Sequence, residues 1–146
     1  MKILEAITIR GILVRNRIVM APMTTRLAAD DGRVTDELIA YYEARAQGEV
    51  GLIVVELSSP HPSGRHRRNE LGIYADHFVD GLAKLVQRLK RYGARVGIQI
   101  GHAGSHARPD VTGVEAVAPS TVPHPVQEGN TRLVRPKHLT KSSLHI

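Results

Sequence analysis

Three short apolar runs, separated by amphipathic stretches, constrain the fold of this 146-residue chain more than any other feature. The runs span residues 17–21, 50–55 and 95–100, and each is rich in Val, Ile or Leu. Nearly continuous apolar runs of this length are typical of strands covered on both faces, as in a parallel sheet. We therefore predict an α/β fold in which parallel strands alternate with helices.

Two helices are predicted between these strands. The first spans residues 36–47, where the Thr35 hydroxyl provides an N-cap and two acids occupy the first turn. In the second, apolar residues recur at spacings of three and four, which predicts a helix that is capped by Asp76 and ends at Tyr92 and Gly93. Each helix would pack against the sheet with its apolar side.

The remaining segments are predicted from turn residues. Residues 7–14 read as a short β-hairpin around Gly11, placed before the main fold. We expect a loop over residues 57–74, and a long functional loop or small hairpin insertion over about 103–136, which is rich in Pro and Gly. Thr140 is a candidate cap for a third helix.

Polar or special residues mark the end of every predicted strand, at residues 22–24, 56–58 and 99–102. This favours a (β/α)8 barrel over a doubly wound sheet, because functional residues of such barrels lie at the strand ends and no Gly-x-Gly-x-x-Gly turn follows the first strand. A barrel typically needs about 250 residues. We therefore expect residues 1–146 to be three N-terminal βα units of one incomplete TIM-barrel domain.

Gln99 is the strongest candidate for ligand binding. Strand alternation places Val96, Ile98 and Ile100 on one face and Gly97, Gln99 and Gly101 on the other. Because the neighbours of Gln99 on that face lack side chains, we expect a bulky group to lie against it, and we expect the amide to be buried. A buried amide needs a partner with donors and acceptors, such as the edge of a flat heterocycle.

Composition excludes several classes of function. The net charge of +6 is accompanied by one Phe and no Trp, so aromatic residues do not interleave with the basic ones as in nucleic-acid-binding modules. The absence of cysteines and of a long apolar segment predicts a cytoplasmic protein that does not bind membranes. His102 and His106 are four residues apart, but they lie in a glycine-rich loop, and we expect no metal site.

Four segments, in this order, resemble the old yellow enzyme family of FMN-dependent ene-reductases and NADH:flavin oxidoreductases, which includes the 2,4-dienoyl-CoA reductases. They are Asn16 to Thr24 (NRIVMAPMT), Gly51 to Glu56 (GLIVVE), Leu71 to Tyr74 (LGIY) and Gln99 to Gly104 (QIGHAG). The resemblance implies a (β/α)8 barrel that binds FMN. It also implies that hydride passes from NADH or NADPH through flavin N5 to an activated C=C bond of a small enone or enoyl substrate.

The same resemblance implies five FMN-contacting residues in this sequence. Pro22 and Met23 resemble the backbone that packs on the flavin, and Thr24 resembles the residue beside flavin O4 and N5. Leu57 takes a position near the pyrimidine ring that is usually occupied by a smaller residue, and Gln99 resembles the amide that binds the pyrimidine. We expect these residues to bind the flavin and tune it rather than to transfer protons.

Two further positions are implied to lie at the substrate side. Arg26 falls where some members carry a catalytic-site tyrosine, and His102 lies in the family's His-Ala-Gly turn, where it would mainly shape the loop. Ser105 replaces the usual basic residue after that turn. The family's catalytic residues would lie beyond this chain, so an alternative is a non-catalytic fragment, or half of a split enzyme, that acts by self-association or with a complementary C-terminal chain.

Two charged features have competing interpretations. Glu56 ends a predicted buried strand, where it could act as a general base, although pairing with an arginine is the preferred interpretation. Residues 65–68 (RHRR) are expected to form a solvated loop, with contact to a phosphate or to CoA as the less favoured interpretation.

Overall fold

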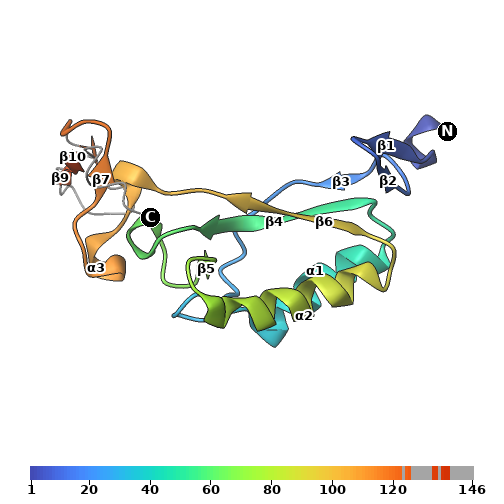
Figure 1. Ribbon diagram of the computed structural model, residues 1–146, viewed down its shortest axis with the longest axis horizontal. Coiled ribbons are helices and arrows are strands. Elements are labelled where there is room, and N and C mark those ends of the chain that lie inside the picture. Colours follow the sequence, from blue (N-terminus) through green and yellow to red (C-terminus); the bar gives the residue numbers. More distant parts are fainter. Residues whose placement is uncertain (123, 126–132, 135, 139–146) are drawn as a thin grey trace.

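A parallel four-stranded sheet lies at the centre of the computed structural model, which describes residues 1–122, 124–125, 133–134 and 136–138 (Figure 1). The long strand β4 (Leu52–Ser59) pairs on one side with β3 (Val19–Met20) and β5 (Leu71–Gly72). On its other side it pairs with β6 (Arg95–Ile100). All three pairings are parallel, which confirms the predicted α/β class.

Two helices, α1 (Asp36–Gln47) and α2 (Val79–Lys90), lie together on one face of this sheet (Figure 1). The core between helices and sheet is made of fully buried apolar side chains that include Leu38, Ile53 and Leu85. Burying each side chain of this size contributes about 1.5–3 kcal/mol. The amphipathic pattern therefore specifies both the helices and the sheet face that they cover.

The N-terminus of α1 is the predicted one, whereas that of α2 is not. Thr35 Oγ1 accepts a hydrogen bond from the Leu38 backbone N–H at 3.1 Å, as an N-cap should. The second helix was expected to be capped by Asp76, but Asp76 begins the short 3₁₀ helix η3 (Asp76–Phe78), which leads directly into α2 without a side-chain cap. The apolar spacing thus predicted the helix, whereas the acidic cap misplaced its first residue.

A β-hairpin precedes the sheet, as predicted. After the 3₁₀ helix η1 (Lys2–Leu4), β1 (Ile7–Ile9) and β2 (Ile12–Val14) pair antiparallel. Arg10 and Gly11 between them have φ values of 45° and 81°. Two successive residues with positive φ are what a tight type I′ hairpin turn requires, and glycine adopts this conformation without steric cost.

Two predicted loops contain more structure than expected. Residues 57–59 continue β4, and β5 was missed because a two-residue strand is too short to show a periodicity. After β6 the chain forms short elements: η4 (Gly104–His106), α3 (Pro109–Thr112), β7 (Val117–Ala118), β8 (His124–Pro125), β9 (Leu133–Val134) and β10 (Lys137–His138). Strands β8 and β9 pair antiparallel and β7 pairs parallel with β10, while the helix start predicted at Thr140 lies outside the described residues.

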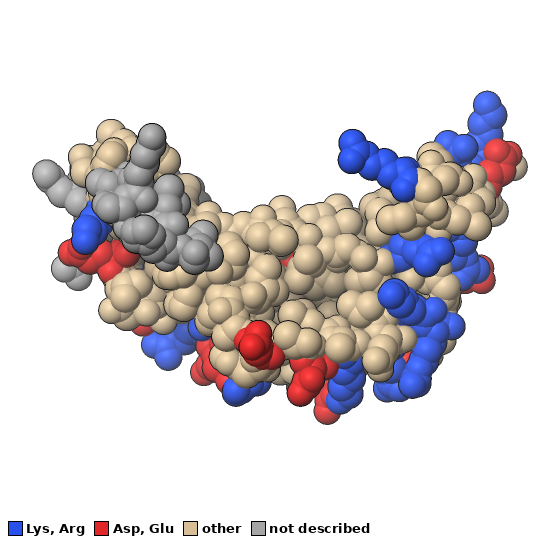
Figure 2. Space-filling model, viewed as in Figure 1, with Lys and Arg blue, Asp and Glu red and all other residues tan. Residues whose placement is uncertain are grey.

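The sheet face opposite the helices is concave and largely free of charge (Figure 2). Alternation along β3 and β4 turns Val19, Leu52 and Val54 toward this face, and Val19 is 53% exposed. Lys, Arg, Asp and Glu gather instead on the convex helical side and at the N-terminal end (Figure 2). In the part of the chain that the structure describes, no helix has the length and apolar character needed to cross a membrane.

Candidate functional site

The ends of the three main strands bring the predicted site residues to one edge of the sheet. Leu57 of β4 lies opposite Gln99 of β6 in the strand register. The segment that leaves β3 is tied to the end of β4, because the Thr25 backbone N–H donates to Glu56 Oε2 at 3.1 Å. Residues 22–24 immediately precede this contact, so the geometry places them at the same edge as Leu57 and Gln99.

Gln99 lies on the predicted face of β6, but its amide is exposed rather than buried. On the opposite face, Val96 and Ile98 pack against the core, whereas Ile100 at the end of the strand is 62% exposed. Within the described residues, nothing covers the face that carries Gln99, and its amide makes no hydrogen bond with any of them. The expectation of a buried amide was wrong for this reason, whereas the orientation derived from alternation was right.

Leu57 occupies the space beside Gly101. A Cβ atom at Gly101 would lie 2.4 Å from Leu57 Cδ1, so the leucine side chain fills the room that the glycine leaves. At Gly97 a Cβ atom would meet nothing within 4 Å. The surface around Gln99 therefore combines one bulky apolar side chain, an open strand and an exposed amide.

The β3 exit adds apolar and polar groups to this edge. Met23 is 62% exposed and Thr24 is also exposed, whereas Pro22 is partly buried. The hydroxyl of Thr24 and the amide of Gln99 can both donate and accept hydrogen bonds. This set fits a flat heterocycle with alternating donors and acceptors, such as the flavin pyrimidine, with Met23 and Leu57 as apolar contacts.

A buried carboxylate lies under this edge. Strict alternation would turn Glu56 toward the concave face, but a bulge between Val55 and Leu57 turns it toward α1. There the Tyr42 hydroxyl donates to Glu56 Oε2 at 3.2 Å and accepts from the Glu56 backbone N–H at 2.8 Å. Within the described residues, the hydrogen bonds of the Glu56 carboxylate come from Tyr42 and Thr25 and not from an arginine, so the preferred arginine pairing was wrong there.

Burial raises the pKa of Glu56, and the hydrogen bonds from Thr25 and Tyr42 only partly oppose that rise. Burial likewise raises the pKa of the Tyr42 hydroxyl. No described residue bonds to the second oxygen, Oε1. The sequence contained one signal for this contact, because Tyr42 lies four residues after Leu38, on the buried side of α1.

His102 joins the end of β6 to the loop after β4. Its Nδ1 accepts from the Gly104 backbone N–H at 2.9 Å, which leaves the proton on Nε2. Nε2 then donates to Ser63 Oγ at 3.1 Å, and Ser63 Oγ donates to His61 Nδ1 at 2.7 Å. Burial and the nearby His61 lower the pKa of His102. The neutral form of His102 therefore holds this loop in place through these hydrogen bonds.

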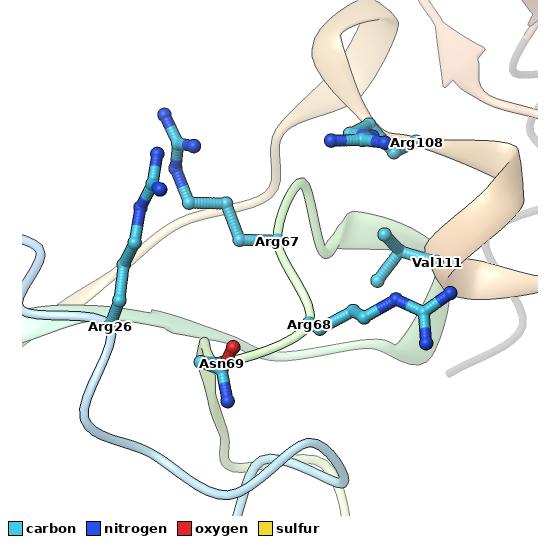
Figure 3. Close-up of a pocket in the computed structure, with 6 residues that line it drawn as sticks. All are labelled: Arg26, Arg67, Arg68, Asn69, Arg108 and Val111. Atoms are coloured by element: carbon cyan, nitrogen blue, oxygen red, sulfur yellow. The ribbon is translucent and has the colours of Figure 1, made fainter.

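Arg26, the other residue expected at the substrate side, is exposed and has a φ of 62°. Its side chain lines a cavity of about 140 Å³ with residues from two other segments: Arg67, Arg68, Asn69, Arg108 and Val111 (Figure 3). The sequence did not predict this cavity, because its arginines are far apart along the chain. Among the described residues no group of three His, Asp or Glu side chains is placed to hold a metal ion.

Comparison with known protein families gives one match over almost the whole chain. The model of the NADH:flavin oxidoreductase / NADH oxidase family matches residues 2–145. An NADPH dehydrogenase from Geobacillus sp. (strain WCH70) is 40% identical over 138 residues, which cover 94% of this chain and 38% of the relative. An NADH oxidase from Thermoanaerobacter brockii is 44% identical over 79% of this chain and 18% of its own length.

Solved structures show the same likeness in three dimensions. The old yellow enzyme homologue from Zymomonas mobilis superposes with a TM-score of 0.83 at 26% identity, covering 94% of this chain and 40% of that protein. This chain thus spans well under half the length of these relatives. The match begins at residue 2 and includes every residue named above at the edge of the sheet.

Proposed function

The chain belongs to the NADH:flavin oxidoreductase / NADH oxidase family, and from this membership we propose that it supplies one side of the FMN site of an ene-reductase-type oxidoreductase. When bound, FMN accepts a hydride from NADH or NADPH and passes it to an activated C=C bond of an enone or enoyl substrate. We further propose that the strands and helices described above are three βα units of a (β/α)8 barrel. The cytoplasmic location of the protein remains a prediction.

Each residue at the edge has a separate part in this proposal. Gln99 would bind the pyrimidine edge of FMN through its amide, and Thr24 would bind the neighbouring polar atoms through its hydroxyl. Pro22, Met23 and Leu57 would provide apolar contact surface. Neither Gln99 nor Thr24 exchanges a proton at neutral pH, so both would bind FMN and adjust its electron affinity rather than act as acid or base.

The exposed Gln99 amide carries the proposal. It lies on the uncovered face of β6, beside Leu57, with its hydrogen-bonding capacity unused by the described residues. A bound heterocycle would satisfy that capacity and would also bury the apolar surface next to it. A solvated amide with no ligand is the alternative, and it predicts no effect of Gln99 on flavin binding.

Titration with FMN tests the proposal. The change in flavin fluorescence would be followed with the wild-type chain, with Gln99→Leu and with the matched control Gln87→Leu, whose glutamine is exposed on α2. We expect Gln99→Leu to weaken FMN binding roughly tenfold, the effect of losing one or two hydrogen bonds, and Gln87→Leu to leave it unchanged. Equal affinities in both variants, or no binding by the folded wild-type chain, would contradict the proposal.

One observation favours the alternative that the chain acts through association with a further chain. In the described residues, the outer edges of β3 and β6 have no partner strand, and apolar side chains such as Val19 are exposed on the concave face. Open sheet edges pair readily with other strands. We propose that a complementary C-terminal chain or a second copy covers this face, and that turnover requires it.

A further inference from the structure

We propose that Glu56 is a positioning residue for the flavin site, because its buried carboxylate ties the exit of β3 to the end of β4 and so fixes where Thr24 and Leu57 lie. This inference rests on the proposed function, since it names the group that holds two of the proposed FMN contacts in place. Glu56 itself is turned away from the face that carries Gln99. It would therefore act through its neighbours and not on the flavin directly.

On the β3 side, the carboxylate holds the segment that follows Thr24. Glu56 Oε2 accepts a hydrogen bond from the Thr25 backbone N–H at 3.1 Å, although the two residues are 31 positions apart. The next residue, Arg26, has a φ of 62°, a left-handed conformation that non-glycine residues rarely adopt and that persists only where surrounding contacts hold it. The Thr25 hydroxyl also accepts from the Leu27 backbone N–H at 3.1 Å. Hydrogen bonds therefore fix this turn on both sides.

On the β4 side, the bulge at Glu56 decides which side chain lies opposite Gln99. Val55 is paired with Ile98 and Leu57 with Gln99, so β4 has one residue more than β6 across this step. Without the extra residue, Glu56 would lie opposite Gln99, on the face proposed to bind FMN. A negative charge there would oppose the addition of electrons to a bound flavin. The bulge places the apolar side chain of Leu57 at this position instead.

Hydrogen bonds hold the bulge from two sides. Tyr42 is fully buried, and its hydroxyl accepts from the Glu56 backbone N–H at 2.8 Å while it donates to Glu56 Oε2 at 3.2 Å. The Ser58 hydroxyl donates to the Glu56 carbonyl at 3.0 Å, before the chain enters η2 (Pro62–Gly64). The backbone and the side chain of Glu56 are thus fixed together. Leu57 is therefore oriented before a ligand binds, which lowers the entropy cost of binding.

The alternative is a carboxylate that only stabilises the fold. Burying a carboxyl group is costly, and no described residue bonds to the second oxygen of Glu56, Oε1. An apolar side chain at this position would avoid that cost. The carboxylate is thus poorly suited to filling the core and well suited to accepting the Thr25 N–H. The alternative predicts that removing the acceptor lowers stability without a specific effect on FMN.

Hydrogen exchange of backbone amides, measured by NMR without FMN, tests the tie itself. The wild-type chain would be compared with Glu56→Leu, which removes the acceptor, and with Glu56→Gln, which keeps an acceptor oxygen. We expect the Thr25 amide to exchange at least about tenfold faster in Glu56→Leu and at nearly the wild-type rate in Glu56→Gln. The Leu38 amide, which is bonded to Thr35 Oγ1, is the internal control and should keep its rate. An unchanged rate for Thr25 in Glu56→Leu would overturn the proposal.

Titration with FMN, followed by flavin fluorescence, then tests what the tie positions. Glu56→Leu should weaken FMN binding about tenfold, whereas Glu56→Gln should stay within about threefold of the wild type because it keeps the acceptor. Tyr42→Phe, which keeps the buried ring but releases the bulge, should also weaken binding, and it provides the same test if Glu56→Leu does not fold. The matched control is Leu89→Ala, a core change near the end of α2 and far from Gln99 along β6. It should lower stability but leave the FMN affinity of the folded protein unchanged.

The outcomes separate this proposal from the flavin proposal. If Gln99→Leu weakens FMN binding but Glu56→Leu and Tyr42→Phe do not, the flavin proposal stands and this inference is overturned. A loss in Glu56→Gln or in Leu89→Ala as large as that in Glu56→Leu would also overturn it, since the acceptor would then not be the cause. If the folded wild-type chain binds no FMN, the flavin proposal fails and the positioning role fails with it.

Discussion

At the scale of single residues, burial changes the protonation of Glu56. Burial raises its pKa above the ordinary value of about 4.3, so the folded state holds the proton more tightly than the unfolded state. The free energy of unfolding therefore falls as pH rises from about 4.3 to the raised pKa. We expect this fall to be smaller in Glu56→Gln, measured by urea denaturation between pH 4 and 8. The control variant Glu37→Gln, at an exposed position in α1, should show the same dependence of the free energy of unfolding on pH as the wild type. The expectation would be contradicted if Glu56→Gln and the wild type showed the same dependence.

Gly64 is a residue whose missing side chain positions its neighbours. A Cβ atom there would lie 2.6 Å from both His102 Cδ2 and Ser59 Oγ, in a buried site. We expect Gly64→Ala to lower the free energy of unfolding by about 1–3 kcal/mol, the typical cost of overpacking, and to move the His102 ring. Denaturant unfolding and the NMR shifts of His102 would measure both effects. Gly97→Ala is the control, because nothing lies within 4 Å of its Cβ position. Equal stability of the two variants would contradict this account.

At the scale of elements, α1 depends on its N-cap. Thr35 Oγ1 accepts from the Leu38 N–H at 3.1 Å and donates to the Leu27 carbonyl at 2.5 Å, so one hydroxyl joins the helix to the segment before it. We expect Thr35→Ala to reduce the free energy of unfolding by about 1 kcal/mol, because both bonds are lost. Thr35→Ser, which keeps the hydroxyl, should retain most of the stability in the same denaturant titration. A loss in Thr35→Ser as large as in Thr35→Ala would show that the methyl group, not the cap, matters.

At the scale of the whole molecule, the concave sheet face exposes apolar side chains that a partner would bury. Its exposed apolar side chains and the open edges of β3 and β6 predict self-association that increases with concentration. We expect sedimentation velocity to show this, and Val19→Lys to suppress it by adding charge to the face. Val79→Lys is matched in chemistry and in exposure, 56% against 53%, but lies at the start of α2 and should not affect association. A monomer at all concentrations would contradict the prediction.

Much of the fold could be predicted because its signals are local. The hairpin, the bounds of α1 and β6 and the face on which Gln99 lies all follow from periods and turn residues within a few positions of each other. The three strand-end segments could be predicted for the same reason. Short elements such as β5, whose existence depends on the neighbouring strand β4, left no such signal.

The sequence by itself thus determined the strand and helix order, the family resemblance and the residue types at the strand ends. Only the tertiary structure decided which distant groups meet. The bulge in β4 turned Glu56 toward Tyr42 rather than toward an arginine, and the folding of three segments brought Arg26, Arg67 and Arg108 around one cavity. The physical reason is that side-chain periodicity depends on neighbouring positions along the chain, whereas partners across the sheet depend on how whole elements pack.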